Sequence, residues 1–254
     1  MLLLLELIPY VTIFLFGIVV GSFLNVCIYR LPEGESIVKV PSHCMSCGAK
    51  LRWFDLIPLF SWLFLRGRCR QCKAVISVQY PVVEAVNGIL WVAVFLVNGM
   101  NGMSVLYSLM ASALLTLSVI DWRTFEIPFG INVFLGVLGV VAVFLEKEEW
   151  RSHLIGAVCV SGVLFVLYLL SKGRAIGGGD IKLMAVSGLF LGAAPTVCAM
   201  FIGLVTGGGY GAYMLISKKL DRKDHFAFGP FLAFGLAVAV FAGDRIAEWY
   251  LGML

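Results

Sequence analysis

The chain has 254 residues, of which 61% are hydrophobic and only 13% are charged, and its mean hydropathy is +0.98. An ordinary soluble domain is about 45–50% apolar and about 25% charged, so this composition excludes a soluble globular protein and indicates a membrane protein. The net charge of +4 does not imply a nucleic-acid partner, because basic residues in membrane proteins usually mark cytoplasmic loops.

Apolar runs predict eight membrane-spanning helices, since a spanning helix needs about 20 mainly apolar residues. They cover residues 5–28, 82–98, 103–121, 128–145, 153–171, 181–193, 196–217 and 227–243. The first run has no basic segment before it and contains Glu6, which favours a retained span over a cleaved signal peptide. The turn signal NGMNG at 98–102 separates the second span from the third. The sixth span is short, and half of a helical hairpin that does not fully cross is an alternative reading.

The distribution of basic residues predicts the orientation of these spans. Of the 19 Lys and Arg residues, only Lys147, Arg151 and Arg245 fall on one side of an eight-span arrangement. The other sixteen lie in or beside the loops 30–80, 121–128, 171–181 and 218–226. By the positive-inside rule this second side is cytoplasmic, which leaves both termini outside.

The loop 30–80 contains two Cys-x-x-Cys pairs, Cys44 with Cys47 and Cys69 with Cys72. Their spacing is close to that of a four-thiolate zinc site, and Gly48 suits the tight turn that such ligands require. Four thiolates leave no open coordination position, so the predicted zinc is structural. Two disulfides are the alternative, which a reducing cytoplasm disfavours.

Two aspartates, Asp121 and Asp180, interrupt apolar runs at the predicted cytoplasmic boundary. An ionisable residue at membrane depth is costly and is therefore a functional candidate. Two carboxyl groups that share a proton supply both the base and the acid that peptide hydrolysis needs. Helix capping, including an N-cap role for Asp180, and contact with headgroups are the alternatives. Because Asp180 begins a predicted helix and Asp121 ends one, the helix dipoles favour the anion at Asp180.

Three glycines, Gly177, Gly178 and Gly179, precede Asp180. Without side chains they allow a second backbone to approach, so an extended substrate can dock there through strand-like hydrogen bonds. A phosphate-binding loop is the alternative, but the spacing does not fit a P-loop and no strand precedes the glycines.

The chain resembles the bacterial type IV prepilin peptidases, the bifunctional leader peptidases and N-methyltransferases of pilus and type II secretion systems. Besides the cysteine pairs, the similar segments are GSFLNVCIYRLP at 21–32, WFDLIPLFSWLFLRGRCRQC at 53–72, YPVVEAVNG at 80–88, DWRTFEIP at 121–128, GGGDIKLM at 177–184 and FGPFLAFG at 228–235. The resemblance implies that Asp121 and Asp180 are the catalytic pair. It also implies cleavage of a prepilin leader after a glycine, at the cytoplasmic face of the inner membrane.

The same resemblance implies methylation of the newly exposed amine, with S-adenosylmethionine as the methyl donor. The expected partners are prepilins or pseudopilins and membrane lipid, with no nucleic acid. The residues that bind the donor stay unassigned: Asn25, Arg30 and Asp55 can line its pocket or simply dock the cysteine loop. Glu84, near the inner end of the second span, is expected to pair with an arginine of that loop.

The expected fold is an all-α polytopic membrane protein of about eight transmembrane helices, with a cytoplasmic zinc-binding loop subdomain after the first helix. The predicted division is a first transmembrane helix at 1–29, the four-cysteine loop at 30–80 and a seven-helix peptidase domain at 81–254. An enzyme of this fold with only one of the two activities is one alternative. A small transporter in which Asp121 and Asp180 relay protons or bind a cation is another.

Overall fold

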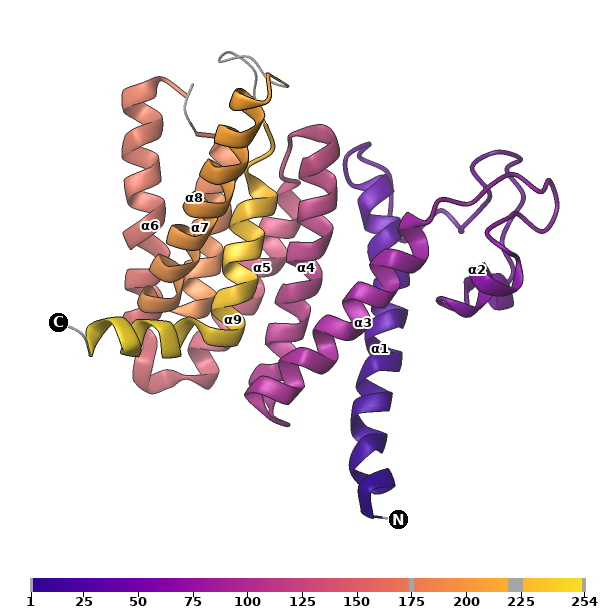
Figure 1. Ribbon diagram of the computed structural model, residues 1–254, viewed down its shortest axis with the longest axis horizontal. Helices are drawn as coiled ribbons and strands as arrows, with labels where there is room; N and C mark the ends of the chain where they lie inside the picture. The colour runs from indigo at the N-terminus through magenta and orange to yellow at the C-terminus, as the bar shows by residue number, and fades with distance from the viewer. Residues whose placement is uncertain (1, 174–175, 219–225, 253–254) are drawn as a thin grey trace. The chain divides into compact units, whose positions relative to one another are not determined.

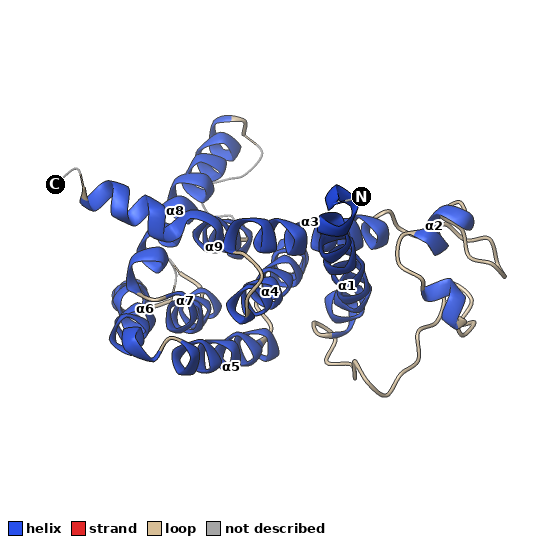
Figure 2. Cartoon of the chain, turned by 90° about the horizontal axis from the view of Figure 1, so that it is seen from below, coloured by secondary structure: helices blue, strands red, loops and turns tan. Residues whose placement is uncertain are grey.

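The computed structural model describes residues 2–173, 176–218 and 226–252 and is helical throughout (Figure 1). The long helices are α1 (Leu2–Arg30), α3 (Gln79–Asn98), α4 (Gly102–Thr124), α5 (Phe129–Leu145), α6 (Trp150–Ser171), α7 (Gly178–Leu191), α8 (Ala193–Ile216) and α9 (Gly229–Leu251). The short ones are η1 (Trp53–Leu56), α2 (Phe60–Phe64) and η2 (Lys147–Glu149). The described residues contain no β-strand, which confirms the predicted all-α class (Figure 2).

Each of the eight predicted spans overlaps one of the long helices. Five stretches are long and apolar enough to cross a membrane: Glu6–Arg30, Gln79–Asn98, Gly102–Thr124, Lys147–Ser171 and Ala193–Ile216. The protein is therefore a multi-pass membrane protein. Two of the remaining helices, α5 and α9, offer shorter apolar stretches. The third, α7, has 14 residues and extends over only about 21 Å, less than the roughly 30 Å of the hydrocarbon core. A count of eight crossings stays a prediction.

Not every residue used to predict the orientation is described. The basic residues Arg174, Lys219, Arg222 and Lys223 lie outside the described residues. The assignment of the cytoplasmic side therefore still depends on the sequence.

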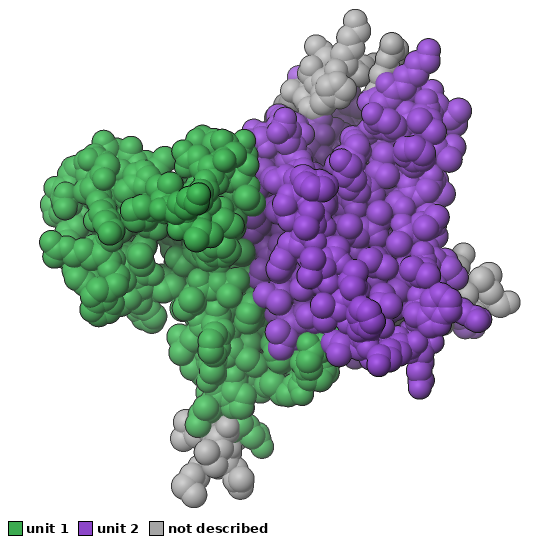
Figure 3. Space-filling model, turned by 180° about the vertical axis from the view of Figure 1, so that it is seen from behind, with its two compact units in different colours: residues 1–104 green, residues 105–254 purple. Residues whose placement is uncertain are grey.

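The chain divides into two compact units, residues 1–104 and 105–254 (Figure 3). The first contains α1, α3 and the loop that joins them, and the second contains α4 to α9 apart from the first turn of α4. The three-part division expected from the sequence stays a prediction.

In the first unit, α1 and α3 pack closely through small residues. A Cβ atom on Gly17 would lie 2.8 Å from the Cα of Gly88, and one on Gly21 would lie 2.7 Å from the Cα of Glu84. The Asn87 side chain donates a hydrogen bond of 2.7 Å to the Gly17 carbonyl oxygen. Small residues at such crossings let two membrane helices approach to backbone contact, where a buried amide can bond across them.

In the second unit, α7 occupies the centre. It contacts α5, α6, α8 and α9, and the Phe190 ring lies edge-on to Tyr107 of α4, with their centroids 5.6 Å apart. Leu183, Met184 and Phe190 of α7 are fully buried. Burial on all sides explains how so short an apolar helix is stable, and it places Asp180, at its beginning, inside the unit.

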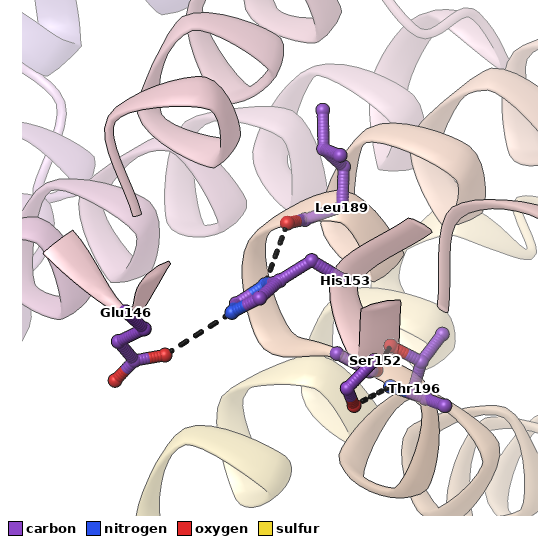
Figure 4. A network of polar contacts seen from close by, with 7 residues as sticks. Glu146, Ser152, His153, Leu189 and Thr196 are labelled. Carbon is purple, nitrogen blue, oxygen red and sulfur yellow. Dashed lines mark hydrogen bonds and ion pairs between the residues drawn. The ribbon is translucent and has the colours of Figure 1, made fainter. Parts of the chain in front are cut away.

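A polar network fixes the other end of α7 (Figure 4). His153 of α6 is buried, and its Nδ1 lies 2.9 Å from the carbonyl oxygen of Leu189, while its Nε2 lies 3.2 Å from a carboxylate oxygen of Glu146. The Ser152 hydroxyl accepts a hydrogen bond of 3.2 Å from the backbone N–H of Ala193, the first residue of α8. These bonds tie α6 to the junction between α7 and α8.

Candidate active site and metal centre

Asp121 lies on the last turn of α4 and is only 5% exposed. Its Oδ2 accepts a hydrogen bond of 2.9 Å from the backbone N–H of Gly229, the first residue of α9. The first N–H groups of a helix have no partner within it, so the Asp121 carboxylate caps α9 from a different helix. A Cβ atom at position 229 would lie 2.6 Å from Oδ2, which explains why this position is a glycine.

Aromatic side chains hold the beginning of α9 beside the end of α4. Trp122 and Tyr210 have ring centroids 5.8 Å apart, and Tyr210 and Phe231 have centroids 5.2 Å apart. Phe226 lies edge-on to Phe231, with a centroid distance of 6.0 Å. The three helices α4, α8 and α9 thus meet in one aromatic cluster next to the bond between Asp121 and Gly229.

Asp180 is the third residue of α7 and is 9% exposed. The N-cap of α7 is Gly177, so the alternative in which Asp180 itself is the N-cap is wrong. The Asp180 side chain instead turns back and accepts a hydrogen bond from the Gly177 backbone. This is the N3 half of a capping box, in which the side chain of the third helical residue accepts a hydrogen bond from the backbone N–H of the N-cap residue.

The structure brings the two aspartates together in the second unit. The charge of Asp121 acts electrostatically on Asp180, and Gly179 packs against Ile127 of the turn that follows Asp121. The Lys182 ammonium lies 5.7 Å from the centroid of the Phe129 ring, which adds a second contact between these segments. Two neighbouring carboxyl groups can hold one proton between them, so one can act as a base and the other as an acid.

Asp180 begins α7 and Asp121 ends α4, as the sequence predicts, but the expected preference for the anion at Asp180 does not follow from these two helices alone. Asp121 does end α4, but it also faces the first N–H of α9, so a helix start favours the anion at both residues. The sequence could not reveal this because Gly229 follows Asp121 by 108 residues.

The three glycines before Asp180 have different surroundings. A Cβ atom on Gly177 would lie 3.1 Å from the Asp180 carboxylate, and one on Gly179 would lie 3.0 Å from the Cβ of Ile127. Gly178 is exposed and has open space where a Cβ would be. Of the three, Gly178 is therefore the residue with the most open surroundings.

The four cysteines of the loop gather in the first unit. The Sγ atoms of Cys44, Cys47, Cys69 and Cys72 all lie within 4.8 Å of one another, and those of Cys44 and Cys72 are 3.8 Å apart. All four are free thiols. Tetrahedral coordination with metal–sulfur bonds of about 2.3 Å places neighbouring sulfurs about 3.8 Å apart, so the cluster could hold a metal ion.

The two cysteine turns repeat one backbone pattern. The N–H of Gly48 bonds to the Cys44 carbonyl at 2.8 Å, and the N–H of Lys73 bonds to the Cys69 carbonyl at 3.1 Å. Both residues have positive φ, 70° at Gly48 and 62° at Lys73, so the second turn holds a lysine where the first has the expected glycine. Backbone hydrogen bonds from Cys47 and Ser46 lower the pKa of the Cys44 thiol to about 6, whereas desolvation and the neighbouring thiols raise the pKa of Cys72 to about 11, so the metal-free cluster keeps a proton at Cys72.

Arg30 and Asp55, two of the residues considered for a methyl-donor pocket, stabilise the cysteine loop. The Arg30 guanidinium donates hydrogen bonds to the carbonyl oxygens of Ser36 at 3.2 Å and Val40 at 2.8 Å. Asp55 forms an ion pair of 2.8 Å with Arg70, beside the second cysteine pair. These contacts favour the loop-docking interpretation for Arg30 and Asp55.

The expectation that Glu84 pairs with an arginine of the cysteine loop is wrong. Its Oε2 accepts a hydrogen bond of 2.7 Å from the backbone N–H of Leu59, and its carboxylate also bonds to the Ser22 side chain. Asn25 lies nearby and donates to the carbonyl oxygen of Tyr80 at 3.2 Å. Sequence reasoning missed Leu59, as it missed Gly229 and His153, because each acts through a partner on a distant segment.

Comparison with known proteins identifies relatives along most of the chain. Residues 15–98, which contain the four cysteines, match the bacterial peptidase A24 N-terminal domain, and residues 108–212, which contain both aspartates, match the type IV leader peptidase family. The prepilin leader peptidase/N-methyltransferase of Bacillus subtilis (strain 168) is 32% identical over 242 residues, which cover 95% of this chain and 97% of the relative.

Two further relatives carry the same name. The protein of Aeromonas hydrophila is 32% identical over 268 residues, covering 94% of this chain and 92% of the relative. The protein of Myxococcus xanthus (strain DK1622) is 36% identical over 218 residues, covering 82% of this chain and 64% of the relative. No solved structure matches the chain.

Proposed function

The chain belongs to the type IV leader peptidase family, and we propose that it is a membrane aspartyl endopeptidase that removes the leader peptide of a prepilin or pseudopilin. Cleavage follows a glycine, and the enzyme then methylates the new N-terminal amine. The observation that supports the proposal is the pair of buried aspartates, Asp121 and Asp180, which interact electrostatically and whose carboxyl groups each accept a hydrogen bond from a backbone N–H at the start of a helix.

The aspartates divide the chemistry of peptide hydrolysis between them. One carboxylate accepts a proton from the attacking water while the other carboxyl group donates its proton to the scissile carbonyl oxygen. The tetrahedral intermediate then collapses, and the departing amine takes up a proton. Gly229 holds the Asp121 carboxylate through its N–H, and the open backbone at Gly178 receives the extended leader.

The site faces the cytoplasm of a bacterial inner membrane. The support is the concentration of Lys and Arg on one side of the predicted spans, together with relatives from bacteria. With this orientation, the aspartates and the cysteine loop share the cytoplasmic side.

The metal is zinc, and its role is structural. Four thiols at distances suited to tetrahedral coordination support zinc, and four protein ligands leave no position for a substrate. S-adenosylmethionine is the methyl donor, an assignment supported by the N-methyltransferase names of the relatives. The donor supplies an electrophilic methyl group to the free amine.

The test mixes the full-length protein, reconstituted in lipid nanodiscs, with a prepilin and S-adenosylmethionine. Mass spectrometry of the product should show loss of the leader and gain of a methyl group. Asp121→Asn and Asp180→Asn should each reduce cleavage by at least about 10²-fold, because each removes a group that must accept or donate a proton. Glu126→Gln, at an exposed carboxylate on the neighbouring turn, is the matched control. Normal cleavage by both Asn variants would show that the aspartyl assignment is wrong.

A further inference from the structure

The segment 53–65 is strongly apolar but leaves most of its apolar side chains exposed. It has 13 residues and contains η1 and α2, neither of which has a buried residue. A segment of this length is too short to cross a bilayer, so membrane spanning does not explain its exposed apolar side chains. These side chains belong to Trp53, Leu56, Ile57, Phe60, Leu63 and Phe64.

The two sides of α2 have different environments. Trp62 faces the cysteine loop: its indole N–H donates a hydrogen bond of 3.3 Å to the Ile76 carbonyl oxygen, and its ring covers Gly67, where a Cβ atom would lie 2.8 Å away. Phe60, Leu63 and Phe64 share the opposite face, at the i, i+3, i+4 spacing, and all three are exposed. The cysteine loop therefore holds α2 from one side and leaves an apolar face open.

A hydrogen bond fixes the depth of α2 along the spanning helix α3. The Leu59 N–H, immediately before α2, donates to Glu84 Oε2 at 2.7 Å, and Glu84 lies five residues into α3. At about 1.5 Å per residue, α2 begins about 7.5 Å below the start of α3. Figure 2 draws α2 to the side of α1 and α3, and Figure 1 draws it at a height between their ends.

The backbone at Leu59 is adapted to this bond. Leu59 has φ 61° and ψ −53°, the strained conformation of a γ-turn that the N–H of Phe60 closes on the Pro58 carbonyl oxygen. Such strain persists only where the surroundings impose it, and the bond to the buried Glu84 carboxylate satisfies a group that would be expensive to leave alone at membrane depth.

Basic residues flank the apolar segment on both sides. Between positions 51 and 73 there are five basic residues and one acidic residue, Asp55, which is paired with Arg70. An exposed apolar face with arginines at its edges is typical of segments that lie in the interface of an anionic membrane. The basic residues are Arg52, Arg66, Arg68, Arg70 and Lys73.

We propose that η1 and α2 lie in the boundary between headgroups and acyl chains of the same bilayer that α1 and α3 span. The exposed face of Phe60, Leu63 and Phe64 enters the acyl region, and the flanking arginines meet anionic headgroups. Glu84 is the anchor that sets the depth, through Leu59. The cysteine loop is then held against the membrane, independently of whether the protein cleaves prepilins.

Site-specific photocrosslinking tests the contact with lipid. Benzoylphenylalanine replaces Phe64 in the full chain, reconstituted in nanodiscs of phosphatidylethanolamine and phosphatidylglycerol. Val38 provides the matched control, because it lies in the same loop and is 85% exposed, against 84% for Phe64. After illumination, mass spectrometry should find a lipid adduct at position 64 several-fold more abundant than at position 38. Equal yields at the two positions, or crosslinks from position 64 to the same chain or a second copy, would overturn the proposal.

Variants of Glu84 test the anchor. With the photocrosslinker at position 64, Glu84→Leu removes the acceptor for the Leu59 N–H and should lower the lipid adduct several-fold, whereas Glu84→Gln keeps a carbonyl oxygen there and should preserve it. Metal content is measured alongside, so that loss of the whole loop fold is distinguished from release of α2. An unchanged adduct in Glu84→Leu would show that Glu84 does not set the depth of α2.

Discussion

Single residues at the aspartyl site are determined by partners far along the chain. Gly229 has no side chain because the Asp121 carboxylate occupies that space, and its N–H holds this carboxylate in place. The position of the Asp121 oxygen therefore depends on the backbone of α9.

Gly229→Ala should impair catalysis more than folding. The new Cβ would lie 2.6 Å from Oδ2 in the present geometry, so either the carboxylate or the start of α9 must move. A displacement of about 1 Å at a reacting group can cost about 10²-fold in rate, and we expect a loss of that order in kcat/KM for prepilin cleavage. Gly208→Ala on α8 is the control, because a Cβ there meets open space and should leave the rate unchanged. Equal rates for the two variants would contradict the role of Gly229.

Lys73→Gly should strengthen metal retention in the cysteine loop. Lys73 has φ 62°, which costs an L-residue about 1–2 kcal/mol, while glycine adopts it freely. After the greater backbone freedom of glycine in the unfolded chain is subtracted, a gain of about 1 kcal/mol remains, equivalent to about fivefold more chelator for half-removal of the metal. Lys39→Gly, at an exposed loop residue without positive φ, should give no gain. If Lys73→Gly lost its metal at a lower chelator concentration than the unchanged protein, the positive φ of Lys73 would not be a source of strain.

The sequence identifies some site residues and not others. Asp121 and Asp180 stand out because charge is rare inside apolar runs, and the cysteines stand out by their spacing. The partners of Asp121 and Glu84 are backbone N–H groups on distant segments. Because nearly every residue has a backbone N–H, the residue types alone do not identify these partners.

At the scale of elements, α7 shows that the sequence predicts the position of a helix but not whether that helix crosses the membrane. Its residues are apolar because five other helices surround it, and the sequence correctly predicts a helix there. Whether a 14-residue helix crosses the bilayer depends on its packing and depth, which periodicity does not encode. Likewise, η1 and α2 fall inside a stretch that the sequence predicts only as a loop.

His153→Ala should destabilise the second unit while leaving the chemistry largely intact. The substitution removes the bonds to Leu189 and Glu146 and leaves a cavity, at a cost of about 2 kcal/mol or more. Because the network lies at the opposite end of α7 from Asp180, cleavage below the unfolding temperature should stay within a few-fold of normal. Thermal unfolding measures the loss of stability, and kcat for prepilin cleavage measures the effect on the chemistry. Glu146→Gln, which keeps an acceptor for the histidine, should lose less stability; an equal loss would contradict the network.

At the scale of the whole molecule, the cysteines and the aspartates belong to different compact units, with the cysteines in residues 1–104 and the aspartates in residues 105–254. Loss of the metal should therefore destabilise residues 1–104 more than residues 105–254.

The double variant Cys44→Ser/Cys72→Ser, or removal of the metal with a chelator, should unfold the cysteine loop and spare the aspartyl site. Two of the four thiolates are lost, so the loop loses the ligands that close it. Limited proteolysis should cut within residues 30–80, metal content should fall, and methylation should decline more than cleavage. Cys27→Ser, outside the cluster, is the control for metal content. Full metal content in the double variant would exclude the four-cysteine site.

The hydrogen bond between Asp121 and Gly229 also bears on how the protein is made. Both aspartates leave the ribosome before the glycine that positions the first of them, which follows Asp121 by 108 residues. A nascent chain therefore carries the acid and the base without the geometry that makes them a pair. On the proposed mechanism, we therefore expect full proteolytic activity only after α9 has inserted and its first N–H has reached Asp121.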